Sequence, residues 1–336
     1  MTGMSASRTA SASGRRLPLA AVVALLGLVL AGCTVGTDYE STPLPEPSRG
    51  DAAPPPAAAT QAPDCGNPLA SYAPQGALPG PGSLPAGSTM AKIRKRGRLV
   101  AGVSADTLLW GSRNPFTGRI EGFDIDVLRA VAQAIFGSED KIEFRVITTS
   151  QRISALQNGD VDIVARTMTI NCARWADIAF SAEYYRAGQK ILVRKGSGVR
   201  DIGGLAKRRV CAPKGSTSLD NLRKEQPTAL PMPADTHTGC LVLFQQGRVD
   251  AITGDDAILA GLAAQDPYAE VVGAAFSEEP YGLGISKDNQ DLVRFVNGVL
   301  ERMRRDGEWR RVYDRWLRAD LGPAPAPPDP VYGRRP

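Results

Sequence analysis

A short internal repeat is the feature of this sequence that most restricts its fold. The segment Leu156–Asp162 (Leu-Gln-Asn-Gly-Asp-Val-Asp) returns 88 residues later as Phe244–Asp250 (Phe-Gln-Gln-Gly-Arg-Val-Asp). Each copy reads as a helix end, a glycine, and a strand that opens with Val-Asp. Seven residues can match by chance, but polar residues also fall in register beyond both strands, Thr167 in one copy and Asp255 in the other. The repeat predicts two similar βαβ lobes that carry ligand groups on both walls of a cleft.

Strands and helices alternate along the chain, which predicts an α/β fold with largely parallel sheets. Apolar residues recur at helical spacing from Leu128 to Ile135, and Gly137 is placed to end that helix. The predicted strands are Arg98–Val103, Lys141–Ile147, Val161–Ala165, Val210–Ala212, the run that ends at Asp255, and Gly282–Ile285. The other predicted helices are Gln151–Gln157, one that begins at Leu219, Asp291–Met303 and Trp309–Leu317.

The stretch Thr167–Arg174 places two hydroxyls and an arginine just beyond a buried strand. Open α/β sheets bind their ligands at the carboxyl ends of strands. The Arg174 guanidinium could hold a carboxylate there through two parallel hydrogen bonds, with Thr167 and Thr169 beside it. The octapeptide alone fits a surface arginine equally well.

Two features of the second half of the chain would complete such a site. The turn Pro213–Ser218 brings glycine and hydroxyl groups to the start of a helix, where exposed N–H groups favour an anion. It lacks the Walker pattern, so nucleotide binding is not supported. Asp255 offers a carboxylate to an ammonium group, although Asp255 or Asp256 could instead cap the next helix.

The N-terminus predicts export and lipid attachment. Arginines precede the apolar run Leu17–Leu30, which is too short to span a bilayer comfortably and has the proportions of a secretory signal. The run ends in Leu-Ala-Gly-Cys33, which resembles a bacterial lipobox. That resemblance implies cleavage after residue 32 and acyl chains, including palmitate, on Cys33. The mature protein would then be held on the outer face of the cytoplasmic membrane by its lipid alone; an ordinary cleaved signal is the alternative.

Proline-rich composition predicts a mobile tether and a mobile tail. Of the 26 prolines, 12 lie between Thr42 and Pro85 and six lie between Gly322 and Pro336. Such chain cannot bury enough apolar surface to offset the entropy of ordering. We therefore expect residues 33–89 to be a tether, residues 321–336 to be disordered, and the folded part to be about 90–320.

Four cysteines remain besides the lipobox cysteine, and an even number in an exported protein suggests disulfides. Three pairings are possible and the sequence leaves them open. We favour Cys211 with Cys240, which would join two elements of one lobe, and this leaves Cys65 with Cys172. His237 is the only histidine and no Cys-x-x-Cys pair occurs, so we expect neither a metal site nor a cofactor.

The formal net charge is +5, and basic residues are scattered without interleaved aromatic residues. The densest cluster, Arg94–Arg98, reads as a solvated helix end ahead of the first strand. Nucleic acid is therefore not an expected partner.

The folded part resembles the polar amino-acid family of solute-binding proteins, the extracellular receptors of ABC importers (bacterial family 3). The matching segments are Glu121–Asp126, Ile153–Asp162, Thr167–Arg174, Phe180–Tyr185, Gly215–Ser218 and Trp309–Leu317. The resemblance implies a two-lobed periplasmic-binding-protein-like fold (type II) with two hinge strands. Lobe 1 would comprise 90–194 plus 286–320, and lobe 2 would comprise 195–285. It further implies a monomer that carries an amino acid to ABC permease subunits and needs no cofactor.

The resemblance also assigns roles to individual residues. Arg174 would hold the α-carboxylate of an amino acid, helped by Thr169 and by Thr217 of the second lobe, and Ser216 of the same glycine-hydroxyl turn would also bind the ligand. Asp255 would hold the α-ammonium together with Thr167.

Asp106 and Trp110 would lie in the cleft wall. Arg152 resembles an arginine that faces the distal carboxylate in glutamate- and aspartate-binding members, and Arg166 and Arg113 would add positive charge. Arg166 stands where the family often has a small residue. A buried excess of cations is costly unless an anion arrives. The prediction is therefore an acidic ligand, glutamate or aspartate, with their amides weaker.

Two other functions fit the same fold. Dehydratases of cyclic carboxylic acids share it, but no histidine or nucleophile–base pair accompanies the motifs, so no enzyme is expected. A receptor that signals to a partner instead of feeding an importer cannot be separated from transport on this sequence.

Overall fold

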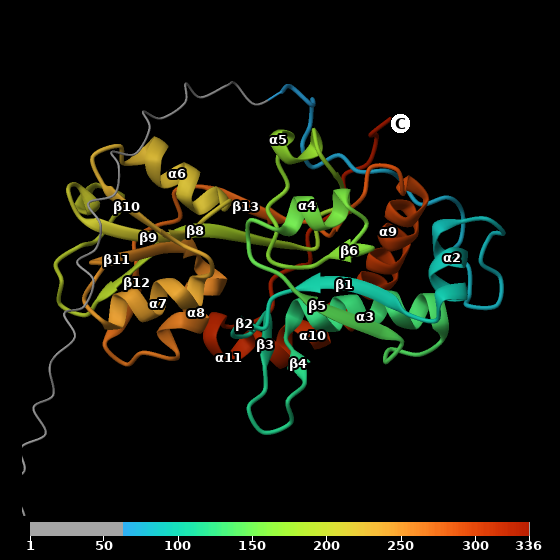
Figure 1. Cartoon of the computed structure of the whole chain (residues 1–336), viewed down its shortest axis with the longest axis horizontal. Coiled ribbons are helices and arrows are strands. Elements are labelled where there is room, and N and C mark those ends of the chain that lie inside the picture. The colour runs from blue at the N-terminus through green and yellow to red at the C-terminus, as the bar shows by residue number, and fades with distance from the viewer. Residues whose placement is uncertain (1–62, 336) are drawn as a thin grey trace, which may run out of the picture. The chain divides into compact units, whose positions relative to one another are not determined.

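The first lobe is built on a five-stranded sheet, visible in the right half of Figure 1. The computed structural model describes residues 63–335; the expected signal segment, Cys33 and the first part of the tether lie outside the described residues. The strand order is β5-β1-β6-β14-β7. Their bounds are β1 Leu99–Val103, β5 Ile142–Val146, β6 Ile163–Val164, β7 Ala179–Phe180 and β14 Gly284–Ile285. β1 pairs in parallel with β5 and β6, and all its residues are buried, as expected for an interior strand of a parallel sheet covered by helices.

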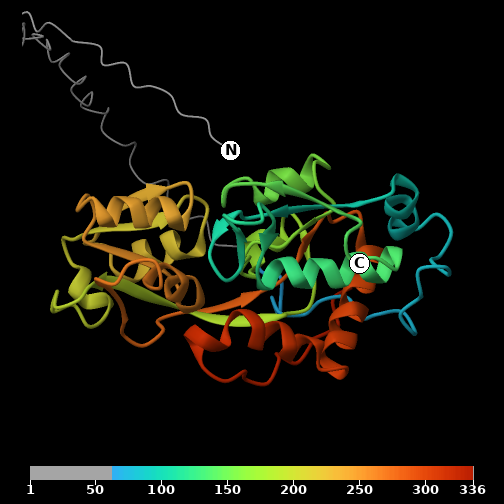
Figure 2. The ribbon, with the colours of Figure 1, turned by 90° about the horizontal axis from the view of Figure 1, so that it is seen from below.

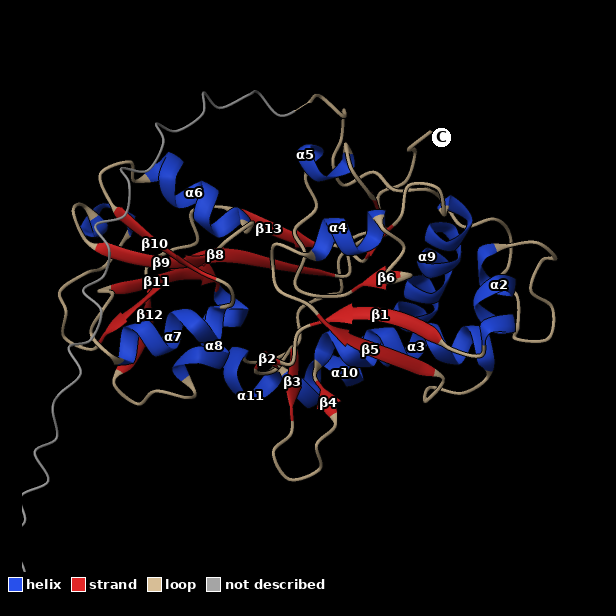
Figure 3. Ribbon diagram, in the orientation of Figure 1, coloured by secondary structure: helices blue, strands red, loops and turns tan. Residues whose placement is uncertain are grey.

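The second lobe has a sheet of order β10-β9-β11-β8-β12, with β13 also paired to β8. Its strands are β8 Tyr185–Arg194, β9 Arg209–Pro213, β10 Leu230–Ala234, β11 Ala251–Asp255, β12 Ala269–Val272 and β13 Glu278–Tyr281. Its helices are η2 Ile202–Leu205, α6 Thr217–Glu225, α7 His237–Gln245 and α8 Asp256–Ala263. Figure 3 shows helices on both sides of this sheet. Helix α6 begins two residues before the predicted start, because Ser216 caps it by accepting a bond from Leu219 N at 3.1 Å.

The remaining elements cover the first lobe and its edge with the second. The helices are α2 Thr89–Arg96, α3 Phe123–Phe136, α4 Arg152–Gln157, α5 Cys172–Trp175, α9 Gln290–Arg305, α10 Glu308–Trp316 and α11 Arg318–Leu321. A small antiparallel sheet contains β2 Asp106–Thr107, β3 Gly111–Arg113 and β4 Ile120–Glu121. Among the described residues, no helix is both long enough and apolar enough to cross a membrane.

Two antiparallel strands, β8 and β13, connect the lobes, as Figure 2 shows from below. Tyr185 pairs with Tyr281 near the first lobe and Gly188 pairs with Glu278 toward the second. The expected lobe boundaries therefore differ from the structure: β8 belongs to the second sheet, and β14 to the first. The sequence does not mark this crossing, because β8 runs through it as one ten-residue strand, mostly buried.

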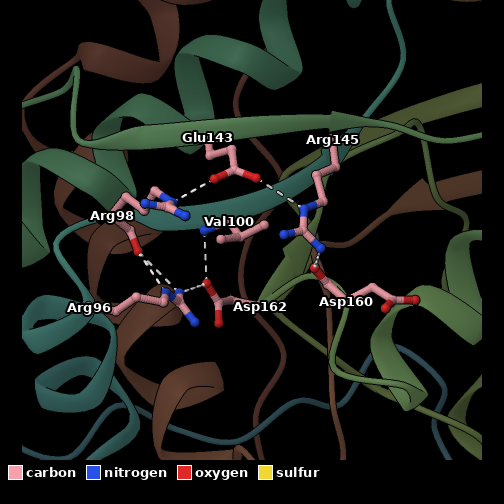
Figure 4. Close-up of polar contacts among 7 residues, drawn as sticks. All are labelled: Arg96, Arg98, Val100, Glu143, Arg145, Asp160 and Asp162. Carbon is pink, nitrogen blue, oxygen red and sulfur yellow. Dashed lines mark hydrogen bonds and ion pairs between the residues drawn. The ribbon is translucent and has the colours of Figure 1, made fainter.

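The internal repeat corresponds to matching structure in the two lobes. In each copy a helix ends two residues before a glycine with φ of 71°, and the strand that follows pairs in parallel with β1 in the first lobe and with β9 in the second. Asp162 Oδ2 accepts a bond from Val100 N at 2.8 Å, as Figure 4 shows, and Asp250 Oδ2 accepts one from Arg209 N at 2.8 Å. The Val-Asp of both copies thus lies immediately before the strand, and its aspartate ties the strand to the neighbouring one.

The basic cluster before β1 is a helix end, as predicted. Gly97 ends α2 in the left-handed region with φ of 90°. Figure 4 shows Arg96 paired with Asp162 and Arg98 paired with Glu143 on the neighbouring strand. These arginines are paired with carboxylates of their own lobe.

The expectation of a mobile tether and tail is wrong for the described parts of both. Ser71 N donates to Val331 O at 2.9 Å, and Ser71 forms a parallel bridge with Tyr332. Tyr72 is buried in the core of the first lobe, and Arg334 lies over the Trp175 ring. Composition misses this because a few aromatic and arginine side chains, each with a partner on the folded lobe, hold otherwise polar and proline-rich chain in place. We call residues 63–88 the N-terminal arm and residues 322–335 the C-terminal arm.

Both favoured disulfides are present, which confirms their pairing. Cys211 and Cys240 join β9 to α7 within the second lobe. Cys65 and Cys172 join the N-terminal arm to α5.

Candidate ligand-binding cleft

A small polar cavity lies between the two lobes. Its lining from the first lobe is Thr149, Arg152, Arg166 and Thr167, and from the second lobe Ser216, Thr217, Ser218, His237, Asp255 and Ile258. Its volume is about 10 Å³, which is close to the space of one water molecule. The lobes are therefore closed on one another, and a larger molecule can be enclosed only if they separate first.

The loop beyond β6 brings the first lobe's residues to the cavity. Thr167 has φ of 43°, in the left-handed region, and its N–H donates to Asp124 Oδ2 at 2.9 Å. The other carboxylate oxygen of Asp124 accepts from Tyr184 OH at 2.5 Å. Burial raises the pKa of Asp124 to about 6, although both hydrogen bonds oppose the rise. Asp124 of α3 thus holds the Thr167 loop in place, a role that sequence reasoning did not assign to it.

Two buried arginines of the first lobe reach across the cleft to one carbonyl of the second. Arg152 Nη2 donates to Gly215 O at 3.2 Å, and Arg174 Nη2 donates to the same oxygen at 3.3 Å. Arg152 also bonds the carbonyls of Thr149 and Arg166, at 2.9 and 3.1 Å. The shared acceptor places the two guanidinium groups side by side at the second lobe's glycine-hydroxyl turn.

A third buried arginine, Arg166, lies deeper in the first lobe. Its Nε donates to Ile147 O at 2.9 Å and its Nη1 to Thr149 Oγ1 at 2.5 Å. Burial lowers the pKa of Arg166 to about 10, and burial also lowers those of Arg152 and Arg174. All three bond neutral oxygens, and none forms an ion pair with a carboxylate of residues 63–335.

Asp255 faces these cations from the end of β11. Its Oδ2 accepts from Tyr281 OH at 2.5 Å, whereas its buried Oδ1 has no partner in the described part of the chain. Burial, and next the nearby Glu279, raise the pKa of Asp255 to about 8. Asp255 precedes α8 but makes no capping bond, while Asp256 accepts from Ala257 N at 2.7 Å. Asp256, and not Asp255, thus accepts a backbone N–H bond at the start of α8.

Glu279 of the hinge strand β13 is a cleft residue that sequence reasoning missed. Its Oε2 accepts from the hydroxyls of Thr169 at 2.6 Å and Thr217 at 2.7 Å, which come from opposite lobes. Its Oε1 accepts from Asn221 and Ser277 of the second lobe. Each hydroxyl has one proton, so Thr169 and Thr217 donate to Glu279 here and are not free to donate to a second carboxylate. No motif points to this residue, because its role depends on the meeting of both lobes.

His237, the first residue of α7, also lines the cavity. Its ring is buried, and its Nε2 has no hydrogen-bond partner within the described chain. Burial, followed by the charge of Arg166, lowers the pKa of His237 to about 3, so the ring is neutral at physiological pH. The sequence showed it only as the lone histidine.

The predicted wall residues Asp106 and Trp110 lie outside the cavity lining. The carbonyl of Asp106 accepts from Thr238 Oγ1 at 2.6 Å. The fully buried Trp110 donates from Nε1 to Ala257 O at 3.3 Å and packs against Tyr185 and other rings. Both residues therefore join the lobes beside the cavity. Arg113 points away too, because its Nη1 donates to Gly118 O at the exposed β3–β4 turn.

Two α/β lobes joined by two strands, with buried arginines of one lobe facing a buried aspartate of the other in a closed cleft, define a protein that opens and closes around a small molecule. The chain belongs to the bacterial extracellular solute-binding proteins, family 3, whose family model matches residues 99–319. It is a solute receptor, not an enzyme.

Several of its relatives are named for the amino acid that they bind. The ABC transporter glutamine-binding protein GlnH of Bacillus subtilis (strain 168) is 39% identical over 233 residues, covering 69% of this chain and 85% of the relative. The glutamate-binding protein GluB of Corynebacterium glutamicum is 32% identical over 235 residues, covering 65% and 78%. Among solved structures, an ancestral arginine-binding protein bound to glutamine is 33% identical with a TM-score of 0.63, covering 66% and 98%. A solute receptor for L-cysteine from Neisseria gonorrhoeae has a TM-score of 0.67 at 26% identity, covering 70% and 96%.

Proposed function

We propose that this receptor binds an acidic amino acid, glutamate or aspartate, and delivers it to an ABC importer. The observation that carries the proposal is the set of three buried arginines at the cleft, none of which is paired with a carboxylate of the described chain. Buried charge without a counter-charge is costly, so the cleft favours a ligand that brings anions. The names of the glutamate-binding and glutamine-binding relatives support a ligand of this size.

The arrangement of charges suggests one orientation for the ligand. Arg174 would bind the α-carboxylate, together with N–H groups at the start of α6, which have no acceptor within the helix. Asp255 would bind the α-ammonium, and the cation would favour the ionised carboxylate. Because Arg174 and Asp255 come from opposite lobes, only the closed form satisfies both ends of the zwitterion.

Arg152, Arg166 and neutral His237 line the cavity, whereas Arg174 lies beside it and reaches the same carbonyl of Gly215 as Arg152. Arg152, Arg166 and His237 would bind the distal carboxylate of glutamate or aspartate. Glutamine offers an amide oxygen there but no charge, so it would leave the arginines without a counter-ion. We therefore expect the amides to bind more weakly than the acids, in contrast to the relatives named for glutamine.

Calorimetry with glutamate, aspartate, their amides, and neutral and basic amino acids tests this specificity. We expect glutamate or aspartate to bind best. Arg152→Gln should weaken glutamate by about 100-fold or more, the cost of leaving a buried carboxylate without its cation, and glutamine by less. Arg145→Gln removes an equally charged but half-exposed arginine of β5 and serves as the matched control. Tightest binding of a neutral or basic amino acid would overturn the acidic specificity.

Membrane attachment and import are further parts of the proposal. Cys33 would carry the acyl chains that hold the receptor on the outer face of the cytoplasmic membrane. Labelled palmitate supplied to cells should be incorporated into the wild-type protein and not into Cys33→Ala; a wild-type protein without label would argue against the lipid anchor. Deleting the receptor should abolish high-affinity glutamate uptake by cells. Unchanged uptake, with binding intact, would point to a sensing role.

A further inference from the structure

The short helix α5, which carries Arg174, is held in place by segments that do not belong to the first lobe's sheet. Helix α5 contains only Cys172–Trp175, too few residues to be stable by its own hydrogen bonds. Its own sequence supplies only a few bonds: Asn171 caps it by accepting from Arg174 N at 2.9 Å, and at the other end Ala176 N donates to Cys172 O at 3.2 Å and Ile178 N to Arg174 O at 2.9 Å. The position of the Arg174 guanidinium therefore depends on what packs against this short turn.

The two arms supply that packing, although both lie outside the residues matched by the family model. Trp175 Nε1 donates to Pro68 O at 2.8 Å, and the Tyr72 ring meets the Trp175 ring edge-on with centroids 6.2 Å apart. From the C-terminal arm, the Arg334 guanidinium lies 3.6 Å from the Trp175 ring centroid. The Cys65–Cys172 disulfide adds a covalent link. The arms thus hold two of the four residues of α5, Cys172 and Trp175.

The arms also hold each other, so they act on α5 as one unit. Arg334 Nε donates to Ala70 O at 2.7 Å and its Nη2 to Asn67 O at 3.0 Å. Asn297 of α9 fixes the N-terminal arm to the lobe, donating to Ser71 Oγ at 2.9 Å and to Tyr72 O at 2.8 Å. A loss at Arg334 would therefore loosen both arms around the Trp175 ring.

We propose that the two arms form a clamp that positions α5, and with it Arg174, for ligand binding. The clamp rests on the proposed function, because it acts through Arg174 as the ligand's carboxylate-binding residue. Arg334, Trp175 and the Cys65–Cys172 disulfide are positioning residues that do not touch the ligand. The role also explains why a proline-rich, polar chain contains a tyrosine, a cysteine and an arginine that are all tied to one turn.

The test compares two adjacent arginines in the full chain. Arg334→Ala removes the contact with Trp175, whereas Arg335→Ala removes an exposed arginine of the same arm. We expect Arg334→Ala to weaken glutamate binding about tenfold, as loss of a cation–π contact and two carbonyl bonds would suggest, and Arg335→Ala to leave affinity unchanged. Arg334→Lys should restore part of the affinity, because an ammonium can lie over the ring but cannot donate to both carbonyls in the same planar fork.

Amide hydrogen exchange and the disulfides provide a second measurement. Exchange in residues 171–178 should accelerate in Arg334→Ala and in the double variant Cys65→Ser/Cys172→Ser, in step with weaker binding. The double variant Cys211→Ser/Cys240→Ser, which opens the other disulfide, should not accelerate exchange at α5. Equal affinities for the Arg334→Ala and Arg335→Ala proteins, with Arg174→Ala inactive in binding, would refute the clamp alone. Full binding by Arg174→Ala would refute the proposed site and the clamp with it.

Discussion

Replacing Asp255 by asparagine should stabilise the ligand-free protein while destroying its binding of amino acids. Asp255 is buried, one of its oxygens has no partner among the described residues, and its pKa is raised from 3.8 to about 8. Each pKa unit corresponds to about 1.4 kcal/mol, so keeping the carboxyl neutral in the closed cleft at pH 7 costs about 4 kcal/mol. Asparagine has no such cost and its carbonyl can still accept the bond from Tyr281.

The predicted gain in the stability of Asp255→Asn depends on pH. The pKa of Asp255 is higher in the folded protein than in the unfolded chain. Below about pH 4 the carboxyl is protonated in both states, so its burial does not lower the free energy of unfolding. As pH rises toward 8 the unfolded chain releases this proton more readily than the folded protein, and the free energy of unfolding of the wild type falls. The Asp255→Asn protein should therefore match the wild type at pH 4 and exceed it by up to about 4 kcal/mol at pH 7. Opening of the wild-type cleft, which returns Asp255 to water, will lower the measured difference.

Urea or thermal unfolding of the ligand-free proteins across pH 4–8 measures the effect, and calorimetry measures ligand affinity. We expect the glutamate affinity of Asp255→Asn to fall by about 100-fold or more, since the buried ammonium loses its counter-charge. Asp256→Asn makes the same change in charge one residue away, at a carboxylate that accepts backbone N–H bonds, and should alter neither property strongly. A stability difference that does not grow with pH, or undiminished affinity in Asp255→Asn, would refute the reasoning.

Three further outcomes follow from the cleft and its surroundings. Glu279→Gln should shift the ligand-free protein toward an open form, visible as a longer inter-lobe distance by fluorescence transfer, because the amide is a weaker acceptor for two hydroxyls from opposite lobes; an unchanged distance would contradict this. His237→Gln should leave the pH dependence of glutamate affinity between pH 5 and 8 unchanged, because the pKa of the ring is near 3; a lost inflection near pH 6 would show that the ring titrates. Trp110→Phe should destabilise the protein by about 1–3 kcal/mol in urea unfolding, since it removes a buried donor to Ala257 O and leaves a small cavity, and equal midpoints would argue against that contact.

Local patterns predicted the lobes and the main charged residues because the relevant signals lie within a few residues of one another. The repeated Gln-x-Gly-x-Val-Asp segment specifies a helix end and a strand start in both lobes, and the structure shows the same hydrogen bond from each aspartate to the neighbouring strand. Arg152 and Arg174 follow strands and lie at the cleft for the same reason, since parallel strands end at a common edge. The pairing of Cys211 with Cys240 needed only the knowledge that both belong to one lobe.

Other features depend on contacts between segments far apart in the sequence, and only the tertiary structure could decide them. Glu279 gains its role when hydroxyls of both lobes meet at one oxygen, and Asp255 gains its raised pKa from the burial that closure brings. The arms are ordered because Tyr72 and Arg334 both pack against the ring of Trp175. No local sequence pattern connects these three residues. By itself, the sequence determined which segments form helices and strands and which of them carry charge. The burial of those charges, and therefore their protonation and their partners, depends on packing in three dimensions, because desolvation is a property of the surroundings and not of the residue.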